Sequence, residues 1–333
     1  MLTLKGPNVN ALFPEALWRM KMDGVLADSR NGAVRKFPYP VLIKYERPQD
    51  RVLFDPLRDA NPFFHLFESI WMLAGRNDVT FPARFAKQMK AYSDDGATLH
   101  GAYGFRWREH FGEDQLTGII DDLQRDPTTR RSVLAMWDSY IDPPVARVGG
   151  KDVPCNTHAY FAVRDGKLDL TVCNRSNDLV WGCFGANAVH MSIMHEYVAR
   201  GAGLEQGVYY QFTNDLHLYE QHFNMMALGG HADHTDPYLS GECRSLPLFG
   251  APAAREDFDK DCEDFCIDQT RRSRTMFFQG TVKPMYLAWR YHSLGETGNA
   301  ERAVQVTEAT DWRKAGLEWL MRRSAQKLMI VKR

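Results

Sequence analysis

Apolar residues recur at helical spacing along much of the chain. The stretch 61–75 (NPFFHLFESIWMLAG) carries one apolar stripe that ends at Gly75, and Glu68 lies within that stripe. Apolar positions three and four residues apart predict an amphipathic helix, and a following glycine or proline predicts its end. The same pattern predicts helices in 116–123, 191–201, 284–294 and 300–328.

Shorter apolar runs predict strands. Residues 158–163 and 168–172 flank a four-residue link with the sequence RDGK. Asp-Gly between two such runs is a strong signal for a β-hairpin. Residues 132–137 and 208–212 are also strand-like. These elements together predict a mixed α+β chain with one large sheet.

The rest of the pattern bears on domain organisation. Residues 230–262 are rich in Gly, Pro, His and Asp, so we expect a long loop or insertion there. Nothing in the chain resembles a linker between domains, so residues 1–333 are expected to form a single domain.

Composition narrows the class of protein. Hydrophobic residues make up 44% and charged residues 25%, as in ordinary globular proteins. Lys and Arg total 41 against 42 Asp and Glu, and this balance argues against direct nucleic-acid binding, which needs a strong positive field. No apolar run reaches the roughly 18 residues of a membrane span, and the first residues lack a signal-peptide pattern.

The cysteines predict a reducing compartment. Six of them are scattered without the spacing of a disulfide framework, so we expect a cytoplasmic protein with reduced thiols. Cys262 with Cys266, and His231 with His234, could suggest a metal site. Their spacings fit no zinc pattern, and a helix places residues i and i+4 on one face anyway, so ordinary packing is favoured and no metal is expected.

Polar residues with chemical potential flank the predicted hairpin. Cys155 opens it, and the polar run 174–178 follows its second strand. A cysteine thiolate is a nucleophile, and nearby arginines favour the thiolate. A lone cysteine is more often a small buried apolar residue, and a polar run is as often a solvated turn.

Arginine-bearing segments and one alternating segment complete the candidates. Residues 126–131 (DPTTRR) lead into a strand, and 29–32 (SRNG) form a predicted turn. Adjacent arginines can bind phosphate, although a charged loop is the simpler interpretation of each segment alone. In 215–219 (DLHLY), an extended chain would place His217 and Tyr219 on one side, and a packed strand is again the simpler interpretation.

Taken in order, these motifs resemble the thymidylate synthase family, which includes pyrimidine nucleotide hydroxymethylases. The resemblance runs from about Asp28 to about Phe223. Its motifs are the arginine turn, the helix with an internal glutamate, YG-x2-W-R, DP-x2-RR, PC, RS-x-D and D-x-H-x-Y. It implies an α+β fold of three layers with a large mixed sheet, helices on one face and the sheet's other face at a dimer interface. Residues 224–333 would then be a divergent C-terminal extension of a catalytic core.

The resemblance also implies a reaction. Family members transfer a one-carbon unit to C5 of a pyrimidine nucleoside 5′-monophosphate, with 5,10-methylenetetrahydrofolate as cosubstrate. Cys155 would attack C6 and raise the electron density at C5. The phosphate would be bound by Ser176 and four arginines, Arg30, Arg175, Arg130 and Arg131. Arg130 and Arg131 would reach across from the second subunit of an obligate homodimer.

The remaining carried-over residues surround the base, the sugar and the folate. Glu68 would act through ordered water on the base as a general acid or base, since a carboxylate among apolar residues is costly without a function. Tyr103 would belong to the same water network. The others are His217 and Tyr219 at the sugar 3′-hydroxyl, Asp178 at the folate pterin and Asn187 at the base edge.

The sequence departs from the family at several of these places. Asn156 stands where histidine is usual after the cysteine, and Met89 and Tyr92 stand where thymidylate synthases have two tryptophans. Matching Asn187 requires a one-residue insertion after Gly182. The short C-terminal tail that closes over folate has no counterpart.

These departures bear on the product and the base. Poorer exclusion of water favours addition of water over hydride transfer, so the chain looks more like a hydroxymethylase than a thymidylate synthase. An amide at Asn187 matches uracil, which favours dUMP over dCMP or CMP. Thymidylate synthesis, and hydroxymethylation of a cytosine nucleotide, remain the alternatives.

Overall fold

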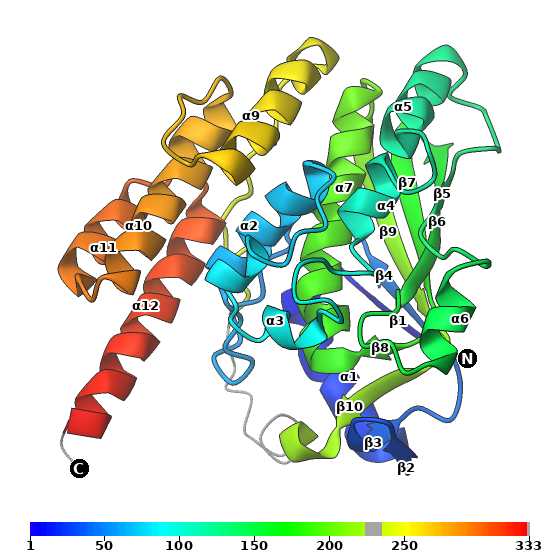
Figure 1. Ribbon diagram of the computed structural model, residues 1–333, viewed down its shortest axis with the longest axis horizontal. Helices are drawn as coiled ribbons and strands as arrows, with labels where there is room; N and C mark the ends of the chain where they lie inside the picture. The colour runs from blue at the N-terminus through cyan, green and yellow to red at the C-terminus, as the bar shows by residue number, and fades with distance from the viewer. Residues whose placement is uncertain (224–234, 332–333) are drawn as a thin grey trace.

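The computed structural model describes residues 1–223 and 235–331, with side chains as far as 325. Within these ranges the strands form two sheets, and helices cover one side of the larger sheet (Figure 1). This architecture confirms the predicted α+β class. The predicted large sheet is present in the described part of the chain, and a second, smaller sheet that the sequence did not reveal accompanies it.

The larger sheet is mixed. Among the described residues its order is β1-β4-β9-β7-β6-β5, with β1–β4 and β7–β9 parallel and the other neighbours antiparallel. The smaller sheet has the order β2-β3-β10-β8. The strands are β1 (Leu2–Gly6), β2 (Val25–Ser29), β3 (Gly32–Lys36), β4 (Val41–Tyr45), β5 (Val133–Ala135), β6 (Asn156–Arg164), β7 (Lys167–Asn174), β8 (Asn177–Asp178), β9 (Glu205–Thr213) and β10 (Leu216–Tyr219).

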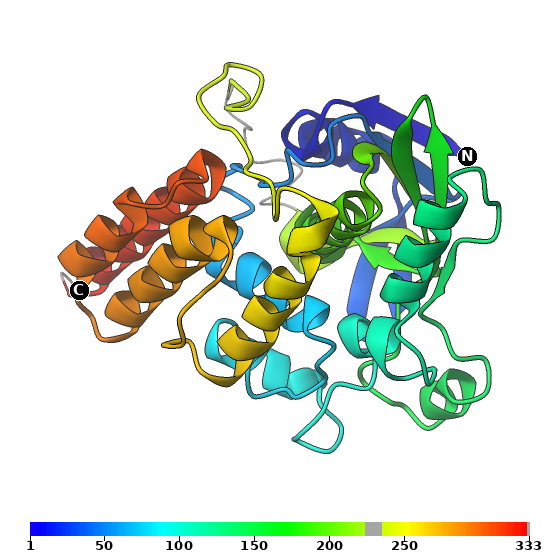
Figure 2. The same cartoon turned by 90° about the horizontal axis from the view of Figure 1, so that it is seen from above.

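The helices fall into a group beside the sheet and a C-terminal group (Figure 2). The first group is α1 (Val9–Asp23), α2 (Pro62–Leu73), α3 (Met89–Tyr92), α4 (Tyr103–Arg108), α5 (Gln115–Arg125), α6 (Asp142–Arg147) and α7 (Asn187–Gly201). The second is α9 (Arg255–Ile267), α10 (Lys283–Ser293), α11 (Thr297–Gln305) and α12 (Thr310–Val331). Short helical turns are η1 (Pro82–Arg84), η2 (Leu179–Ala186), η3 (Pro252–Ala254) and η4 (Phe278–Val282).

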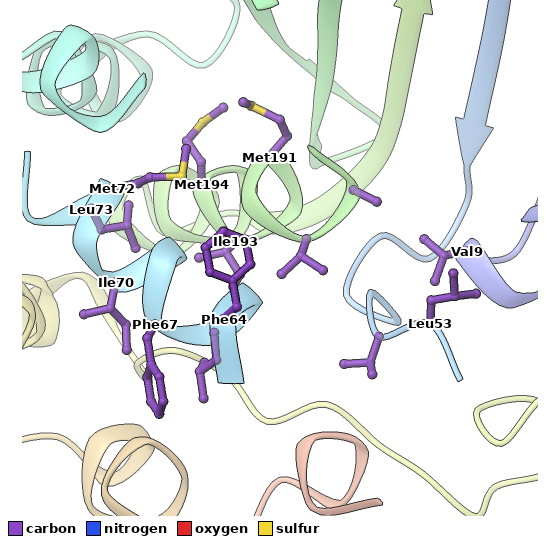
Figure 3. Close-up of a cluster of buried hydrophobic side chains, with 14 of the residues drawn as sticks. Val9, Leu53, Phe64, Phe67, Ile70, Met72, Leu73, Met191, Ile193 and Met194 are labelled. Carbon is purple, nitrogen blue, oxygen red and sulfur yellow. The ribbon is translucent and has the colours of Figure 1, made fainter. Parts of the chain in front are cut away.

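Helix α2 lies where the first group meets the C-terminal group, with α7 on one side and α9 on the other, which explains why all its residues are buried. It begins at Asn61, whose side chain accepts a hydrogen bond from the Phe64 N–H (3.1 Å), and it ends before Gly75 at φ +69°. On one side, apolar side chains of α2 and α7 share a core cluster (Figure 3). On the other side, the ring of Phe67 lies 5.5 Å from that of Phe265 in α9.

The predicted hairpin is confirmed in its register. Arg164 pairs with Lys167, and the two residues between them, Asp165 and Gly166, have φ of +49° and +75°. Positive φ at both central positions is the turn geometry that suits the twist of a two-residue hairpin. The open end of this hairpin therefore brings the residues before β6 next to those after β7.

Three features differ from the sequence-based expectation. Residues 255–262, expected in a loop, begin the helix α9, whose buried Phe258 packs among aromatic rings. The stretch 300–328 is divided between α11 and α12, because the backbone leaves the helix at Val306 and Glu308 N–H donates to Gly280. The strands of the first 45 residues were not predicted; two of them, β2 and β3, have too few buried positions for a clear pattern.

Candidate active site

The hairpin places Cys155 beside Arg175. Asn156 and Asn174 pair across β6 and β7, and the Arg175 N–H donates to the Cys155 carbonyl at 2.9 Å. The Arg175 guanidinium donates to the carbonyls of Pro154 (2.8 Å) and Val153 (3.0 Å). These contacts hold its Nη2 3.8 Å from the Cys155 Sγ. The predicted proximity of thiol and arginine is therefore present.

Burial and charge act on Cys155 in opposite directions. Burial raises the pKa of the Cys155 thiol, and Asp152 adds to the rise, whereas Arg175 and Arg30 lower it. The net pKa is raised, so the free thiol is protonated at neutral pH. The two arginines therefore reduce the rise in the Cys155 pKa that burial causes, but they do not bring the pKa below its ordinary value, contrary to the expectation from the sequence.

A cavity of about 570 Å³ lies next to this pair. The candidate residues that line it are Arg30, Arg175, Ser176, His217 and Tyr219. Lys36 and Trp137, which the sequence analysis did not single out, line it as well. Asp28 and Asp215 line it too, and Asp215 pairs with Lys36 at 2.7 Å. Arg30 and Arg175 are therefore the cations of this cavity that suit an anion.

The smaller sheet assembles the far wall of this cavity. Arg30 lies in the turn between β2 and β3, and its Nη1 donates to the Gly150 carbonyl at 2.9 Å. His217 and Tyr219 extend from β10 with their rings 5.4 Å apart, as the alternating pattern predicted. The Nδ1 of His217 lies 3.5 Å from the hydroxyl of Ser176.

Arg130 and Arg131 lie elsewhere in the chain. Both are exposed in the loop between α5 and β5, and neither is among the residues that line the cavity. Within this chain the structure therefore brings together two of the four candidate phosphate-binding arginines, Arg30 and Arg175.

Glu68 is a buried carboxyl without a cationic partner close enough to pair with it among the described residues. Burial raises its pKa to about 8, and Asp152 adds to the rise. The Oε2 of Glu68 lies 3.3 Å from Nε2 of His190 on α7. Burial lowers the pKa of His190 to about 3, so this imidazole is neutral and lends Glu68 no positive charge. At neutral pH Glu68 is therefore mainly a carboxylic acid.

Tyr103 supports the backbone at Cys155. Its hydroxyl oxygen accepts hydrogen bonds from the backbone N–H groups of Cys155 (2.9 Å) and Asn156 (3.0 Å). Burial raises the pKa of Tyr103, which keeps its hydroxyl protonated and able to donate. The hydroxyl thus has one proton left for another acceptor.

Asp178 begins η2, where its carboxylate accepts from the Trp181 N–H. Tyr92 lies nearby: burial raises its pKa, and the charges of Tyr219, Asp178 and Asp152 add to the rise. The Tyr92 side chain is 43% exposed, whereas Met89 is buried. Of the two positions where the family has tryptophan, Tyr92 therefore lies toward the candidate site.

Asn187, the first residue of α7, lies in a chain of buried amides. It accepts from Nδ2 of Asn156 (3.1 Å) and donates to Oδ1 of Asn177 (3.0 Å). Asn156 in turn accepts from Nδ2 of Asn174. Sequence reasoning did not identify Asn174 and Asn177 as partners of Asn187. Asn174 is the last residue of β7 and Asn177 the first of β8, and the polar run 174–178 to which both belong was the available signal.

In residues 1–223 and 235–331, no group of three or more His, Cys, Asp or Glu side chains could hold a metal ion. Cys262 and Cys266 are buried in α9. His231 and His234 lie outside the described residues. None of the helices in the described ranges has the length and apolarity needed to cross a membrane.

Comparison with known proteins fits this arrangement. The family model "Thymidylate synthase" matches residues 62–240. The chain is 46% identical to a deoxyuridylate hydroxymethyltransferase of Pseudomonas phage M6, over 98% of this chain and 95% of that protein. It is 37% identical to the protein of the same name from Bacillus phage SP01, over 66% of this chain and 59% of that protein.

A solved structure extends the likeness to the fold. The crystal structure of thymidylate synthase from T4 phage superimposes with a TM-score of 0.53 at 20% identity, and the match covers 67% of this chain and 81% of that one. With a family model over more than half of the chain and a relative aligned along nearly all of it, this protein is a member of the thymidylate synthase family.

Proposed function

We propose that this protein is a deoxyuridylate hydroxymethyltransferase, which adds a hydroxymethyl group to C5 of dUMP. The observation that carries the proposal is a thiol, Cys155, held 3.8 Å from Arg175, which lines a cavity together with Arg30. A nucleotide whose phosphate enters this cavity would bring its base toward the thiol. The names of the relatives from phages M6 and SP01 favour dUMP and hydroxymethylation.

Cys155 would act as the nucleophile. Its sulfur would bond to C6 of the pyrimidine, and the electron pair of the C5–C6 double bond would move onto C5 and the C4 carbonyl. The thiol must lose its proton for this step, and water in the cavity would accept it. Its raised pKa in the free chain means that deprotonation would accompany the attack rather than precede it.

The phosphate would be bound by Arg30, Arg175 and Ser176 from this chain. Arg130 and Arg131 would complete the site from a partner, because both are exposed and lie away from the cavity of their own chain. This proposal implies a two-fold homodimer with shared phosphate sites.

Glu68 and Tyr103 would manage protons around the base. A carboxyl whose pKa is about 8 is protonated at neutral pH, so Glu68 can donate to the oxygen at C4 as charge develops there. The Tyr103 hydroxyl accepts two backbone hydrogen bonds and retains its proton for water or substrate. Both side chains would therefore stabilise the adduct formed by Cys155.

The residues beside η2 fit 5,10-methylenetetrahydrofolate. Trp181 exposes 37% of its surface, enough to stack on a pterin, and Asp178 offers a carboxylate to pterin N–H groups. Arg58, whose guanidinium lies 5.7 Å from the Trp181 ring, has a buried Nη2 with no hydrogen-bond partner among the described residues. That atom is suited to a carboxylate. The folate would supply the one-carbon unit that C5 captures.

Water would complete the reaction. C5 would give up its proton to an acid–base group as tetrahydrofolate leaves with a protonated nitrogen, which creates an exocyclic methylene at C5. Water would add to this methylene and pass its proton to the surrounding acid–base groups, and Cys155 would leave as a thiolate as the C5–C6 double bond is restored. The sum is dUMP, methylenetetrahydrofolate and water giving hydroxymethyl-dUMP and tetrahydrofolate. Tyr92, with a smaller ring than the family's tryptophan, favours water entry at this position.

Residues 1–333 would act as one domain, because α2 is buried on one side by α7 and on the other by α9 to α12. The C-terminal extension would thus support α2, the helix that carries Glu68, on the side away from α7, rather than form an independent unit.

Product identification tests the function. The protein is incubated with dUMP and methylenetetrahydrofolate, and the nucleotide is analysed by mass spectrometry. Gain of CH₂O supports hydroxymethylation; gain of CH₂, with dihydrofolate absorbance, would establish thymidylate synthesis instead. The Cys155→Ala variant should lose turnover and the release of tritium from C5-labelled dUMP. Cys173→Ala, at a half-buried cysteine on β7, is the matched control and should retain both.

A further inference from the structure

Four asparagine side chains form a continuous series of hydrogen bonds between the catalytic hairpin and α7. The Thr213 hydroxyl donates to Oδ1 of Asn174 (3.3 Å), and Nδ2 of Asn174 donates to Oδ1 of Asn156. Asn156 Nδ2 then donates to Asn187 Oδ1 (3.1 Å), and Asn187 Nδ2 to Asn177 Oδ1 (3.0 Å). We call Asn174, Asn156, Asn187 and Asn177 the amide relay. All four are buried, with at most 8% of their surface exposed.

Every bond in the relay has the same direction, and this direction determines what Asn187 can still offer. A side-chain amide has two N–H donors and two acceptor lone pairs. The relay occupies one N–H and one lone pair of Asn187. One donor at Nδ2 and one acceptor at Oδ1 remain, at positions set by its two neighbours.

The two pyrimidine bases require opposite arrangements. Uracil presents an N3–H donor and an O4 acceptor, whereas cytosine presents an N3 acceptor and an N4–H donor. Reading cytosine would need the Asn187 amide reversed. Reversal of Asn187 alone would set its Nδ2 against Nδ2 of Asn156 and its Oδ1 against Oδ1 of Asn177, and buried donors or acceptors left facing each other are costly.

We propose that the amide relay determines the base, with Asn174 and Asn156 acting as positioning residues that hold Asn187 in its uracil-reading orientation. This inference rests on the proposed function, because it assumes that Asn187 meets the base. Asn174 would thereby influence the choice of base through two successive hydrogen bonds, from the end of β7.

The backbone around the relay is shaped to admit it. A Cβ added at Gly182 in η2 would lie 2.2 Å from Oδ1 of Asn177 and 3.2 Å from Nδ2 of Asn187. Gly182 therefore leaves the space in which these two amides meet. At the end of the relay, Nδ2 of Asn177 is buried and has no partner in the described residues, so Asn177 could instead donate if the relay were reversed.

Aspartate substitutions test the direction of the relay. A carboxylate can only accept hydrogen bonds. In Asn174→Asp, Asn156 must turn its Nδ2 toward position 174; Asn187 must then turn toward Asn156, and Asn177 can supply the matching donor. Asn156→Asp forces the same reversal one step closer to the base. In Asn177→Asp, the new carboxylate accepts from Asn187 as before, so this variant is the matched control for an added buried charge.

The measurement is kcat/KM for dUMP and for dCMP with methylenetetrahydrofolate, from neutral to alkaline pH, so that the introduced carboxyls become ionised. Each variant is compared with wild type at the same pH, because ionisation of Glu68 near pH 8 would lower the activity of wild type as well. We expect Asn174→Asp and Asn156→Asp to lower the dUMP/dCMP ratio roughly a hundredfold or more, because mismatched hydrogen-bonding groups discriminate strongly. Asn177→Asp should keep the wild-type ratio. A thermal melt with and without nucleotide establishes that each variant folds.

The outcomes separate the relay from the proposed function. A wild-type protein without activity on either nucleotide contradicts the function itself. A wild type that prefers dUMP, with Asn174→Asp and Asn156→Asp retaining that preference, overturns the relay and leaves the function standing. An equal loss of preference in Asn177→Asp would also overturn it, because charge rather than direction would then be the cause.

Discussion

Two buried glutamates beside helix α7 differ in every contact that sets their charge. Glu68 faces His190 in the first half of α7, and burial raises its pKa to about 8. Glu196, in the second half, is bound by Arg51 and by Arg200 (2.7 Å) and accepts from the Leu248 N–H (3.1 Å). Burial alone would raise the pKa of Glu196, but the two arginines outweigh it and lower the pKa.

The difference separates a supporting carboxylate, Glu196, from the carboxyl proposed to react, Glu68. Glu196 has cations and a backbone donor that compensate its burial, so its charge joins α7 to the segments around it. Glu68 remains buried without such compensation, and a group in that condition titrates where catalysis needs it. Burial is common to both glutamates, so it does not distinguish them. The presence or absence of cationic partners determines whether the pKa is lowered or raised.

The largest expected effect comes from removing the acid at position 68. Glu68→Gln keeps the shape and removes the proton donor, so kcat/KM for dUMP should fall by roughly two to four orders of magnitude. The free energy of unfolding at neutral pH should not fall, because the neutral amide avoids the cost of burying a carboxyl whose pKa is raised to about 8. Steady-state kinetics with urea denaturation on the same preparation checks both. Turnover within about tenfold of wild type would contradict a general acid role for Glu68.

Removing Arg51, the cation that binds Glu196, should lower the stability of the fold and leave the activity intact. Arg51→Met leaves the Glu196 charge buried with one arginine fewer, and we expect a loss of about 3 kcal/mol in the free energy of unfolding. The activity of the folded fraction should remain. The double variant Arg51→Met/Glu196→Gln should recover part of the loss, and a fully additive result in that cycle would argue against the pairing.

The pH dependence of stability should also differ in sign. The pKa of Glu68 is higher in the folded protein than its ordinary 4.5, so wild type is stabilised relative to Glu68→Gln at low pH and loses that advantage between pH 4.5 and about 8. The slope is at most about 1.4 kcal/mol per pH unit. Because the pKa of Glu196 is lowered, its contribution is lost instead as pH falls.

The free energy of unfolding is measured by denaturation at a series of pH values. Subtracting the value for each variant from that of wild type gives these slopes. The subtraction removes the common titration of His65, His190 and Asp152, which lie near Glu68. A Glu68 difference that rises with pH in this window would show that the carboxyl is ionised and compensated in the fold.

The smallest effect is expected at an exposed pair. Lys167 and Glu205 form an ion pair at 3.0 Å, with 54% and 76% of their side chains exposed. Lys167→Ala should change the free energy of unfolding by less than about 0.5 kcal/mol. A loss comparable to that of Arg51→Met would mean that ion pairing, rather than burial, governs the contrast described above.

Local pattern was sufficient for part of the fold and site. The helix 61–75 and the Asp-Gly hairpin follow from spacing and turn chemistry, and both are confirmed. Because the hairpin's register follows from its turn, the proximity of Cys155 and Arg175 could also be anticipated. The roles of the candidate residues stay predictions.

Other features depend on contacts between distant segments. The smaller sheet joins residues near 30 to residues near 217, and its β2 strand is largely exposed, so no apolar alternation marks it. The amide relay joins residues from three separate segments, and nothing in any one segment indicates that their side chains bind one another. Arg51 and Glu196 likewise become a pair only when the loop before α2 meets α7.

The position of α2 has a consequence for engineering. Its two sides are enclosed by α7 and by the C-terminal helices, where Phe63 lies 5.5 Å from Trp319 in ring centroids. Removing the C-terminal helices to obtain a smaller catalyst would expose to solvent the side of α2 that packs against them. Phe63 and Phe67 would then face water, whereas Glu68 lies on the side toward His190 of α7. A minimal version of the enzyme would therefore need a replacement cover that keeps α2, and with it Glu68, in place.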